Sequence, residues 1–192
     1  MNLELNKNKN KILIIGGSQG ANPLNEHFYN NYEFYIKNNY QIILQCGTNN
    51  YNSIPDYIKN KKDILIKGFF NKDNMLKVYK AADLVIARAG AISISELTYL
   101  SKAMILIPYK YAADNHQEIN AKSIENKKAC ITINQDKLKT GILESTIKKL
   151  FNENLINQLE NNSFKASYPN ATDSIYKQIK SIIANNHKIG NA

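Results

Sequence analysis

The chain alternates short apolar segments with amphipathic ones. Six apolar segments have the length of strands, at residues 12–15, 40–45, 64–67, 84–87, 104–107 and 130–133. Helical patterns lie between them, at residues 23–35, 73–81 and 92–101. A further helical pattern follows the polar loop at residues 109–114 and continues to about residue 127. Strands that alternate with helices are typical of βαβ units. The pattern therefore predicts an α/β fold with a Rossmann-like, doubly wound parallel sheet of about six strands.

The last third of the chain is predicted to be helical and to complete a single domain. Apolar residues recur at helical spacing over residues 142–151 and again over residues 175–183. The chain shows no internal repeat and no linker, and 192 residues suit one domain. We expect an N-terminal extension at residues 1–10, the domain at residues 11–185 and a tail at residues 186–192.

Composition narrows the class of protein. The net charge is +9, but Arg88 is the only arginine among the 25 basic residues, and the lysines are scattered. Grooves for nucleic acid favour arginine, because its guanidinium binds phosphates and base edges with two parallel hydrogen bonds. A nucleic-acid partner is therefore not expected. Cys46 and Cys130 suit buried reduced thiols, since they have neither metal-ligand spacing nor a disulfide framework.

The apolar segments are too short to cross a membrane, because a spanning helix needs roughly 18 consecutive apolar residues. The first residues are polar and lack the apolar stretch of a signal peptide. We therefore expect a cytoplasmic protein.

Three loops should meet at one edge of the predicted sheet. In the common strand order 3-2-1-4-5-6, strands 1 and 4 are neighbours, and ligands bind beside their carboxyl ends. This order places the glycine-containing turns at residues 16–20 and 88–91 side by side, with the loop at residues 114–117 next to them. The fold thus gathers segments from distant parts of the chain into one cleft.

Residues 16–20, Gly-Gly-Ser-Gln-Gly, allow several interpretations. A dinucleotide fingerprint needs the spacing Gly-x-Gly-x-x-Gly, which this segment lacks. It also needs an acidic residue at the end of the second strand, where Gln45 stands instead. The segment matches the Gly-x-Ser-x-Gly of a hydrolase nucleophile elbow, but no motif supports His116 or Asp83 as partners of Ser18. It could also be a turn that brings backbone N–H groups and the Ser18 hydroxyl to a phosphate or sugar, or an ordinary turn between strand and helix.

Residues 88–96, Arg-Ala-Gly-Ala-Ile-Ser-Ile-Ser-Glu, have two interpretations. Gly90 permits a turn, and residues 91–93 would begin a helix whose free N–H groups and dipole attract a diphosphate. Glu96 then lies about one turn further, where its carboxylate can accept hydrogen bonds from two vicinal hydroxyls, as on a ribose. Alternatively, Ser93 and Glu96 form a capping box. The residues alone leave both open.

Residues 114–121, Asp-Asn-His-Gln-Glu-Ile-Asn-Ala, should begin a helix with Asp114 or Asn115 as its cap. His116 among carboxylates suggests a metal, but no second histidine or cysteine has the spacing to join it, so no metal site is expected. Loops rich in amides and hydroxyls suit hydrogen bonds to a sugar.

In this order, the three segments resemble the C-terminal, donor-binding half of the MurG family. Its members are the UDP-N-acetylglucosamine transferases that convert lipid I to lipid II in peptidoglycan synthesis. The similarity rests on the segments at residues 16–21, 88–96 and 114–121, and it runs from about Lys11 to the C-terminal helix. It implies one half of a GT-B glycosyltransferase that inverts the anomeric carbon and needs no metal or other cofactor at the donor.

The resemblance also implies roles for individual residues. Ser18 would contact the UDP-N-acetylglucosamine donor near its diphosphate, the backbone of Phe70 would contact the uracil, and Gln117 would bind hydroxyls of the sugar. Residues 91–93 would hold the diphosphate, and Glu96 would bind the ribose. The implied donor-binding residues are Ser18, Phe70, Ala91, Ile92, Ser93, Ile94, Ser95, Glu96 and Gln117, supported by Gly17, Arg88, Gly90, Asn115 and His116.

We expect no counterpart of the family's N-terminal half in this sequence, because the first predicted strand begins about ten residues after Met1. In the family, that half binds the undecaprenyl-linked acceptor and carries the suspected general base, so no catalytic residue is assigned. We expect an N-acetylglucosaminyltransferase domain, a hexosyltransferase, that needs an acceptor-binding half and contacts the membrane peripherally. The alternatives are a subunit of a dolichol-type transferase, a UDP-sugar hydrolase and a non-catalytic remnant.

Overall fold

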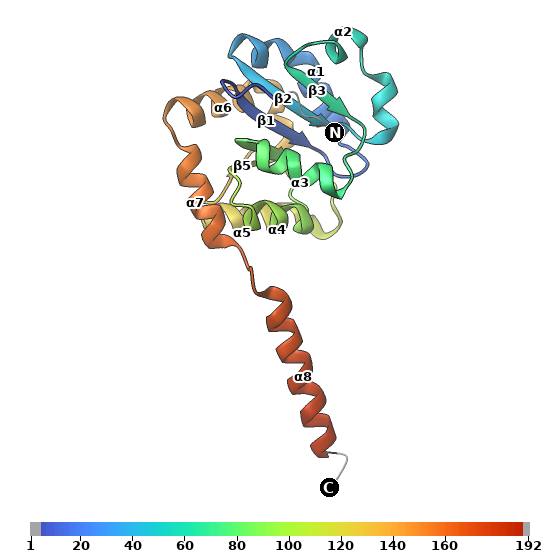
Figure 1. The fold of residues 1–192 in the computed structure, drawn as a ribbon, viewed down its shortest axis with the longest axis vertical. Coiled ribbons are helices and arrows are strands. Elements are labelled where there is room, and N and C mark those ends of the chain that lie inside the picture. Colours follow the sequence, from blue (N-terminus) through green and yellow to red (C-terminus); the bar gives the residue numbers. More distant parts are fainter. Residues whose placement is uncertain (1–4, 190–192) are drawn as a thin grey trace.

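The computed structural model describes residues 5–189, with the side chains of residues 5–183. Its centre is a six-stranded sheet in the order β3-β2-β1-β4-β5-β6, in which all neighbouring strands are parallel (Figure 1). This order is the predicted one. The strands are β1 (Asn10–Ile15), β2 (Tyr40–Gln45), β3 (Ile64–Lys67), β4 (Leu84–Ala87), β5 (Met104–Leu106) and β6 (Ile131–Thr132).

Helices connect the strands and continue after the last one. The α-helices are α1 (Asn22–Lys37), α2 (Asp56–Lys59), α3 (Lys72–Ala81), α4 (Ala91–Tyr99), α5 (His116–Asn126), α6 (Ile142–Asn152), α7 (Ile156–Ala166) and α8 (Ala171–Ile189). The 3-10 helices are η1 (Thr48–Ser53), η2 (Ala113–Asn115) and η3 (Gln135–Thr140).

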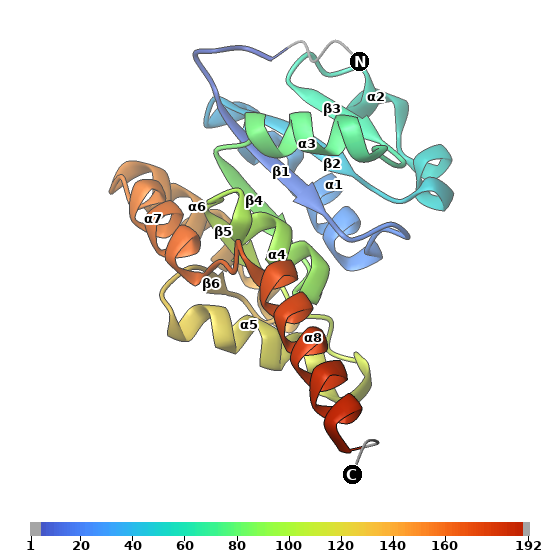
Figure 2. The same cartoon turned by 60° about the horizontal axis from the view of Figure 1, so that its bottom comes forward.

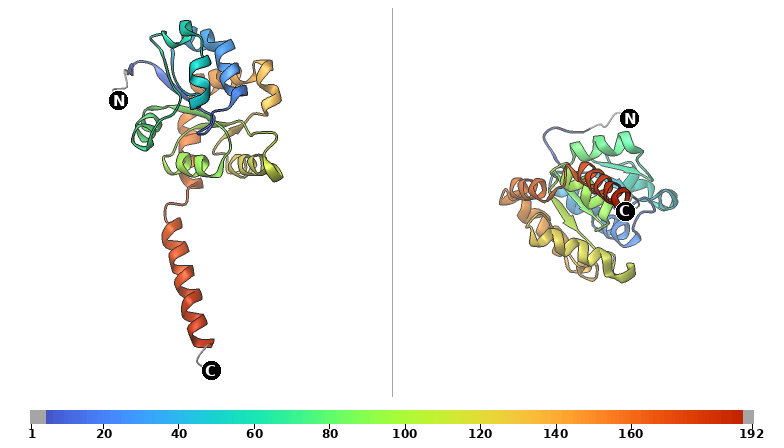
Figure 3. Two further views of the ribbon diagram at one scale, coloured as in Figure 1. Left: turned by 90° about the vertical axis from the view of Figure 1, so that its right-hand side faces the viewer. Right: turned by 90° about the horizontal axis from the view of Figure 1, so that it is seen from below.

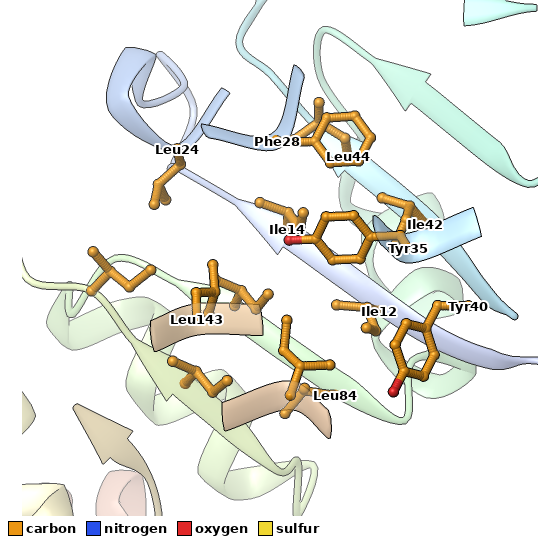
Figure 4. Close-up of a cluster of buried hydrophobic side chains, with 14 of the residues drawn as sticks. Ile12, Ile14, Leu24, Phe28, Tyr35, Tyr40, Ile42, Leu44, Leu84 and Leu143 are labelled. Atoms are coloured by element: carbon orange, nitrogen blue, oxygen red, sulfur yellow. The ribbon is translucent and has the colours of Figure 1, made fainter. Parts of the chain in front are cut away.

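Both faces of the sheet are covered, because successive strand residues point to opposite sides. Ile12 and Ile14 of β1 point into a core formed with α1, α2 and α6, and Figure 4 shows this layer. Leu13 and Ile15 point into the other core, formed with α3, α4 and α5. Figure 2 shows α3 and α4 on that second face. The near-continuous apolar strands predicted from the sequence are therefore buried on both sides, as a parallel sheet requires.

The strands β2, β3 and β4 have the predicted bounds, whereas other boundaries differ by a few residues. β1 begins at Asn10 because Asn10 already pairs with Tyr40. The elements η1 and α2 were not predicted. In α2 only Ile58 is buried, so the segment has no apolar repeat to detect. Residues 1–4 of the expected extension and 190–192 of the expected tail lie outside the described residues.

α8 extends away from the rest of the molecule as a long single helix (Figures 1 and 3). The predicted helical repeat is confirmed, but its apolar side chains do not enter the core. They are between 50% and 61% exposed. These side chains are Ile175, Tyr176, Ile179, Ile182 and Ile183.

In the described part of the chain, no helix combines the length and the apolar character needed to cross a bilayer.

Candidate functional site

The carboxyl ends of the central strands lie together at one edge of the sheet. Ile15 pairs with both Gln45 and Ala87, and Gln45 also pairs with Lys67. The loops that follow β1, β2, β3 and β4 therefore begin side by side. This arrangement brings together the turns at residues 16–20 and 88–91, as the predicted strand order requires.

Residues 16–20 form a tight turn that packs directly on the end of β2. Gly17 and Gly20 have φ angles of 87° and 77°, in the left-handed region that favours glycine. A Cβ atom on Gly20 would lie 1.9 Å from the carbonyl oxygen of Cys46. The turn leaves Ser18 exposed, so its hydroxyl can meet a ligand.

α4 begins directly after the second turn. Gly90 is its N-cap, and no side chain caps the helix. The capping box from Ser93 and Glu96 is therefore wrong, because Ser93 already lies within the helix. The first N–H groups of a helix have no partner inside it and carry the positive end of the dipole. Ala91 and Ile92 are exposed at this end, so it is open to an anion.

The other predicted residues of this segment differ in burial. Ser93 is half-buried and Ser95 is exposed. Ile94 packs in the core with its side chain 7% exposed, and its N–H donates to the carbonyl oxygen of Gly90 at 3.0 Å. Ile94 therefore anchors α4 to the sheet and has neither its side chain nor its N–H available for a ligand.

Glu96 lies on the solvent side of α4 and contacts a tyrosine of the neighbouring helix. Its Oε2 accepts a hydrogen bond of 3.1 Å from the hydroxyl of Tyr79, on α3. Burial, together with the nearby charge of Glu96, raises the pKa of Tyr79, so Tyr79 stays a neutral donor at physiological pH. A carboxylate offers several lone pairs, so Glu96 retains the capacity to accept hydrogen bonds from ligand hydroxyls.

Arg88 is buried beneath the site and holds the loop after β5. Its Nη1 donates to the carbonyl oxygens of Ile107 and Pro108 at 3.0 and 3.1 Å, and its Nη2 donates to Oε1 of Gln135 at 2.6 Å. Burial lowers the pKa of the guanidinium from its ordinary value. The supporting role expected for Arg88 is thus one of fixing a loop beside the turn at residues 88–91.

A hollow of about 500 Å³ lies between the glycine turn, η1 and the loop after β5. Its walls include Gly20, Asn50, Tyr109 and Gln117. Oε1 of Gln117 accepts a hydrogen bond of 3.0 Å from the backbone N–H of Tyr109, which fixes the direction of the amide. The volume is in the range of sites for small ligands.

Asn115 and His116 are exposed where η2 meets α5. Asn115 has a φ of 52°, and Nδ1 of His116 lies 2.7 Å from the carbonyl oxygen of Ala113. These contacts shape the start of α5, which carries Gln117. Within the described residues, no three His, Cys, Asp or Glu side chains gather as they would around a metal ion.

Phe70 follows β3, and its side chain is 2% exposed. Its backbone N–H donates to Oε1 of Gln45 at 2.9 Å. The aromatic ring thus belongs to the core, and any contact of Phe70 with a ligand falls to its backbone.

Sequence reasoning missed three polar residues at this edge: Gln45, Asn50 and Tyr79. Nδ2 of Asn50 donates to the carbonyl oxygen of Cys46 at 2.9 Å and lies 3.4 Å from that of Gln19, so it links η1 to the glycine turn. Only Gln45 carried a signal, as an amide at the end of an otherwise apolar strand. The partners of Asn50 and Tyr79 depend on how η1 and α3 pack.

The strand order, with helices on both faces, defines a Rossmann-like α/β domain of the type found in GT-B glycosyltransferases. Residues 11–180 match the glycosyltransferase family 28 C-terminal domain. The chain therefore belongs to this family, which confirms the resemblance seen in the three sequence segments.

Two curated relatives are named UDP-N-acetylglucosamine--N-acetylmuramyl-(pentapeptide) pyrophosphoryl-undecaprenol N-acetylglucosamine transferase. The one from Halothermothrix orenii is 42% identical over 160 residues, which are 80% of this chain and 43% of the relative. The one from Finegoldia magna is 32% identical over 187 residues, which are 96% of this chain and 50% of the relative. The chain thus spans about half the length of these relatives.

Solved structures agree with this assignment. The crystal structure of Acinetobacter baumannii MurG matches with a TM-score of 0.75 and 26% identity, over 93% of this chain and 51% of that one. The UDP-GlcNAc 2-epimerase from Neisseria meningitidis, bound to UDP-GlcNAc, matches with a TM-score of 0.62 over 92% of this chain and 45% of that one. At 12% identity, the epimerase shares the fold alone.

Proposed function

We propose that this chain binds UDP-N-acetylglucosamine (UDP-GlcNAc) as the donor domain of an inverting hexosyltransferase that converts lipid I to lipid II. Membership of family 28, through a match that covers residues 11–180, is the observation that carries this proposal. The names of the relatives supply the donor and the acceptor. The meeting of three loops at the carboxyl edge of the sheet supports a donor site there.

Each proposed contact follows from the chemistry available at this edge. The free N–H groups at residues 91–93 suit the diphosphate, and the exposed hydroxyl of Ser18 suits the same region of the donor. The carboxylate of Glu96 suits two ribose hydroxyls, and the amide of Gln117 suits hydroxyls of the sugar. The backbone of Phe70 is left for the uracil.

In the proposed reaction, a hydroxyl oxygen of the acceptor attacks C1 of N-acetylglucosamine from the face opposite the diphosphate. The bond between C1 and the β-phosphate oxygen breaks, and its electron pair leaves with UDP. Negative charge therefore grows on the diphosphate, where the N-terminus of α4 stabilises it. The proton of the acceptor hydroxyl goes to a base on the acceptor-binding half.

The proposed partner is an acceptor-binding half. The matched relatives are about twice as long as this chain, so a second domain of comparable size accompanies this one in them. The apolar stripe of α8, exposed over Ile175, Ile179 and Ile182, is a surface for such a domain. Because the acceptor is attached to undecaprenol, the reaction takes place peripherally at the cytoplasmic face of the membrane.

Titration calorimetry of the purified chain with UDP-GlcNAc tests the donor site. Glu96→Ala should weaken binding by about 1–3 kcal/mol, the scale of lost hydrogen bonds to a charged group. Glu153→Ala removes the same charge from an exposed position outside the site and should leave binding unchanged. UDP-glucose serves as the control for the sugar.

The outcomes separate the proposal from its alternatives. A well-folded chain that binds UDP-GlcNAc no better than other nucleotides would overturn the donor role and favour a non-catalytic remnant. Release of free N-acetylglucosamine without an acceptor would favour a UDP-sugar hydrolase. Transfer to lipid I only when an acceptor-binding half is added would support a split transferase.

A further inference from the structure

Gln45 is a buried amide between two loops of the candidate site. It is the last residue of β2, and its side chain is 3% exposed among the apolar residues of the sheet. A buried amide is stable in such surroundings only when its polar atoms are hydrogen-bonded. Both ends of this amide have partners, and the two partners belong to different loops.

The amide of Gln45 joins the loop after β1 to the loop after β3. Its Nε2 donates to the carbonyl oxygen of Gly17 at 3.1 Å. Its Oε1 accepts from the backbone N–H of Phe70 at 2.9 Å. The Gly17 carbonyl also accepts from the N–H of Gly20 at 3.1 Å, so the glycine turn closes on the oxygen that Gln45 holds.

These two bonds determine the direction of two peptide units. In a trans peptide, the C=O and the following N–H point in opposite directions. Because the Gly17 carbonyl points toward Gln45, the N–H of Ser18 points away from Gln45. Because the Phe70 N–H points toward Gln45, the carbonyl of Phe69 points away from it. One side chain thus orients backbone groups in the loop proposed for the diphosphate and in the loop proposed for the base.

We propose that Gln45 is a positioning residue that couples the diphosphate loop to the base loop of the nucleotide site. It touches no ligand itself and acts through the peptide units at residues 17–18 and 69–70. Because the Phe70 N–H is already donated to Gln45, the carbonyl of Phe70 is the backbone group left for the base. A carbonyl accepts from the N3–H of uracil, whereas N3 of cytosine is itself an acceptor. This inference rests on the proposed function, because it takes the ligand to be a uridine diphosphate compound.

Two substitutions separate the two bonds. Gln45→Glu keeps an acceptor for the Phe70 N–H and loses the donor to the Gly17 carbonyl. Gln45→Met has a similar length and loses both. Gln41→Met is the matched control, since Gln41 is a buried glutamine on the same strand at the opposite edge of the sheet, 4% exposed.

Binding of UDP, UMP and CDP to each variant is the first measurement. Both Gln45 variants should lower the preference for UDP over UMP at least about fivefold, because the Ser18 N–H is no longer aimed at the diphosphate. Gln45→Glu should keep the preference of the wild type for UDP over CDP, and Gln45→Met should lose it. Gln41→Met should keep both preferences. Losses of preference in all three variants that simply follow their losses of stability, Gln41→Met included, would overturn the proposal.

Amide hydrogen exchange of the ligand-free chain is the second measurement and needs no nucleotide. Gln45→Met should speed exchange at the Phe70 N–H at least about tenfold, Gln45→Glu should leave it protected, and both should speed exchange at Gly20. Protection of Phe70 that persists in Gln45→Met would overturn the proposal. A wild-type chain that binds no uridine nucleotide would overturn the proposed function instead, and the exchange data would still decide whether Gln45 orients the two loops.

Discussion

The hydroxyl of Tyr79 lies 3.1 Å from Oε2 of Glu96 and donates a hydrogen bond to it. The two residues come from different helices, α3 and α4, and the contact joins a buried phenol to an exposed carboxylate. Tyr79 thereby limits the rotamers that Glu96 can adopt. If Glu96 binds a ribose, Tyr79 prepares its carboxylate for that contact.

Tyr79→Phe should weaken binding of UDP-GlcNAc by about 0.5–1.5 kcal/mol, the range of a single hydrogen bond. The loss should be smaller for 2′-deoxy-UDP than for UDP, because the deoxyribose offers Glu96 one hydroxyl fewer. Calorimetric titrations with both nucleotides measure this. Tyr29→Phe, on α1, removes a hydroxyl from the other face of the sheet and should change neither affinity. An equal loss for both nucleotides would contradict a link between Tyr79 and the ribose.

Gly20→Ala should destabilise the chain more than Gly17→Ala. Both glycines have positive φ, so each substitution carries a backbone penalty of about 1–2 kcal/mol. At Gly20 the new Cβ would also meet the Cys46 carbonyl at 1.9 Å, whereas at Gly17 nothing lies within 4 Å. Overpacking of this kind adds about 1–3 kcal/mol. Urea unfolding of the two variants measures the difference, and equal free energies of unfolding would show that the turn can move away from β2.

Arg88→Lys should lower the free energy of unfolding by about 1–3 kcal/mol, because one ammonium cannot reproduce the fork that bonds Ile107, Pro108 and Gln135. The loop that carries Tyr109 should loosen as well. Affinity for UDP-GlcNAc should therefore fall more than affinity for UDP, which lacks the sugar. Urea unfolding and titration of both nucleotides test these expectations. A variant as stable as the wild type would mean that the three contacts of Arg88 contribute little.

Stability should fall in acid through Glu144, on α6. Its Oε1 lies 2.8 Å from Nε2 of His27, and the two side chains are 14% and 8% exposed. Burial alone would raise the pKa of Glu144, but the hydrogen bond with His27, a hydrogen bond from the backbone of Glu144 and the charge of His27 together outweigh burial and lower the pKa from its ordinary value. Since the folded pKa lies below the unfolded one, the carboxylate stabilises the fold above about pH 4.5 and loses this effect as the pH falls through the folded value.

Glu144→Gln should therefore lower the free energy of unfolding by about 1–3 kcal/mol at neutral pH. The gap to the wild type should narrow as the pH falls through the lowered folded pKa of Glu144, because the protonated carboxyl is then neutral like the amide of Gln. Urea unfolding between pH 3 and pH 7 measures this, with the exposed Glu153→Gln as the control. A gap that stays constant over this range would exclude an electrostatic role for Glu144.

The fold was predictable because its strands are buried on both faces. Short, continuous apolar segments such as Leu84–Ala87 indicate strands that are buried on both faces, and the glycine turns mark where the strands end. The elements η1 and α2 escaped because polar residues such as Asn50 dominate them. α8 is the opposite case, in which an apolar pattern predicts a helix correctly but does not mean that the helix is buried. Its apolar repeat is real, but within the described residues no other element packs on that face, and its apolar side chains stay exposed.

The parts of the candidate site that depend on short local motifs were predictable from the sequence. Glycine turns and a free helix N-terminus are local features, so the turn that carries Ser18 and the helix that begins at Ala91 could be predicted from the sequence. The capping-box interpretation was wrong because the N-cap of α4 is Gly90 and not Ser93. The position of the N-cap depends on where β4 ends, at Ala87. The contact between Tyr79 and Glu96 spans 17 positions and two elements, which no local pattern records.

Arg88, the single arginine of the chain, donates hydrogen bonds to the loop after β5 and to Gln135 of η3, and among the residues that line the hollow it is the only charged one. A diphosphate at this edge would meet backbone N–H groups and a helix dipole in place of a guanidinium. The dipole at an exposed helix N-terminus is screened by dissolved salt. The affinity for an anionic nucleotide should therefore fall as the ionic strength rises, a direction that the net charge of +9 also favours.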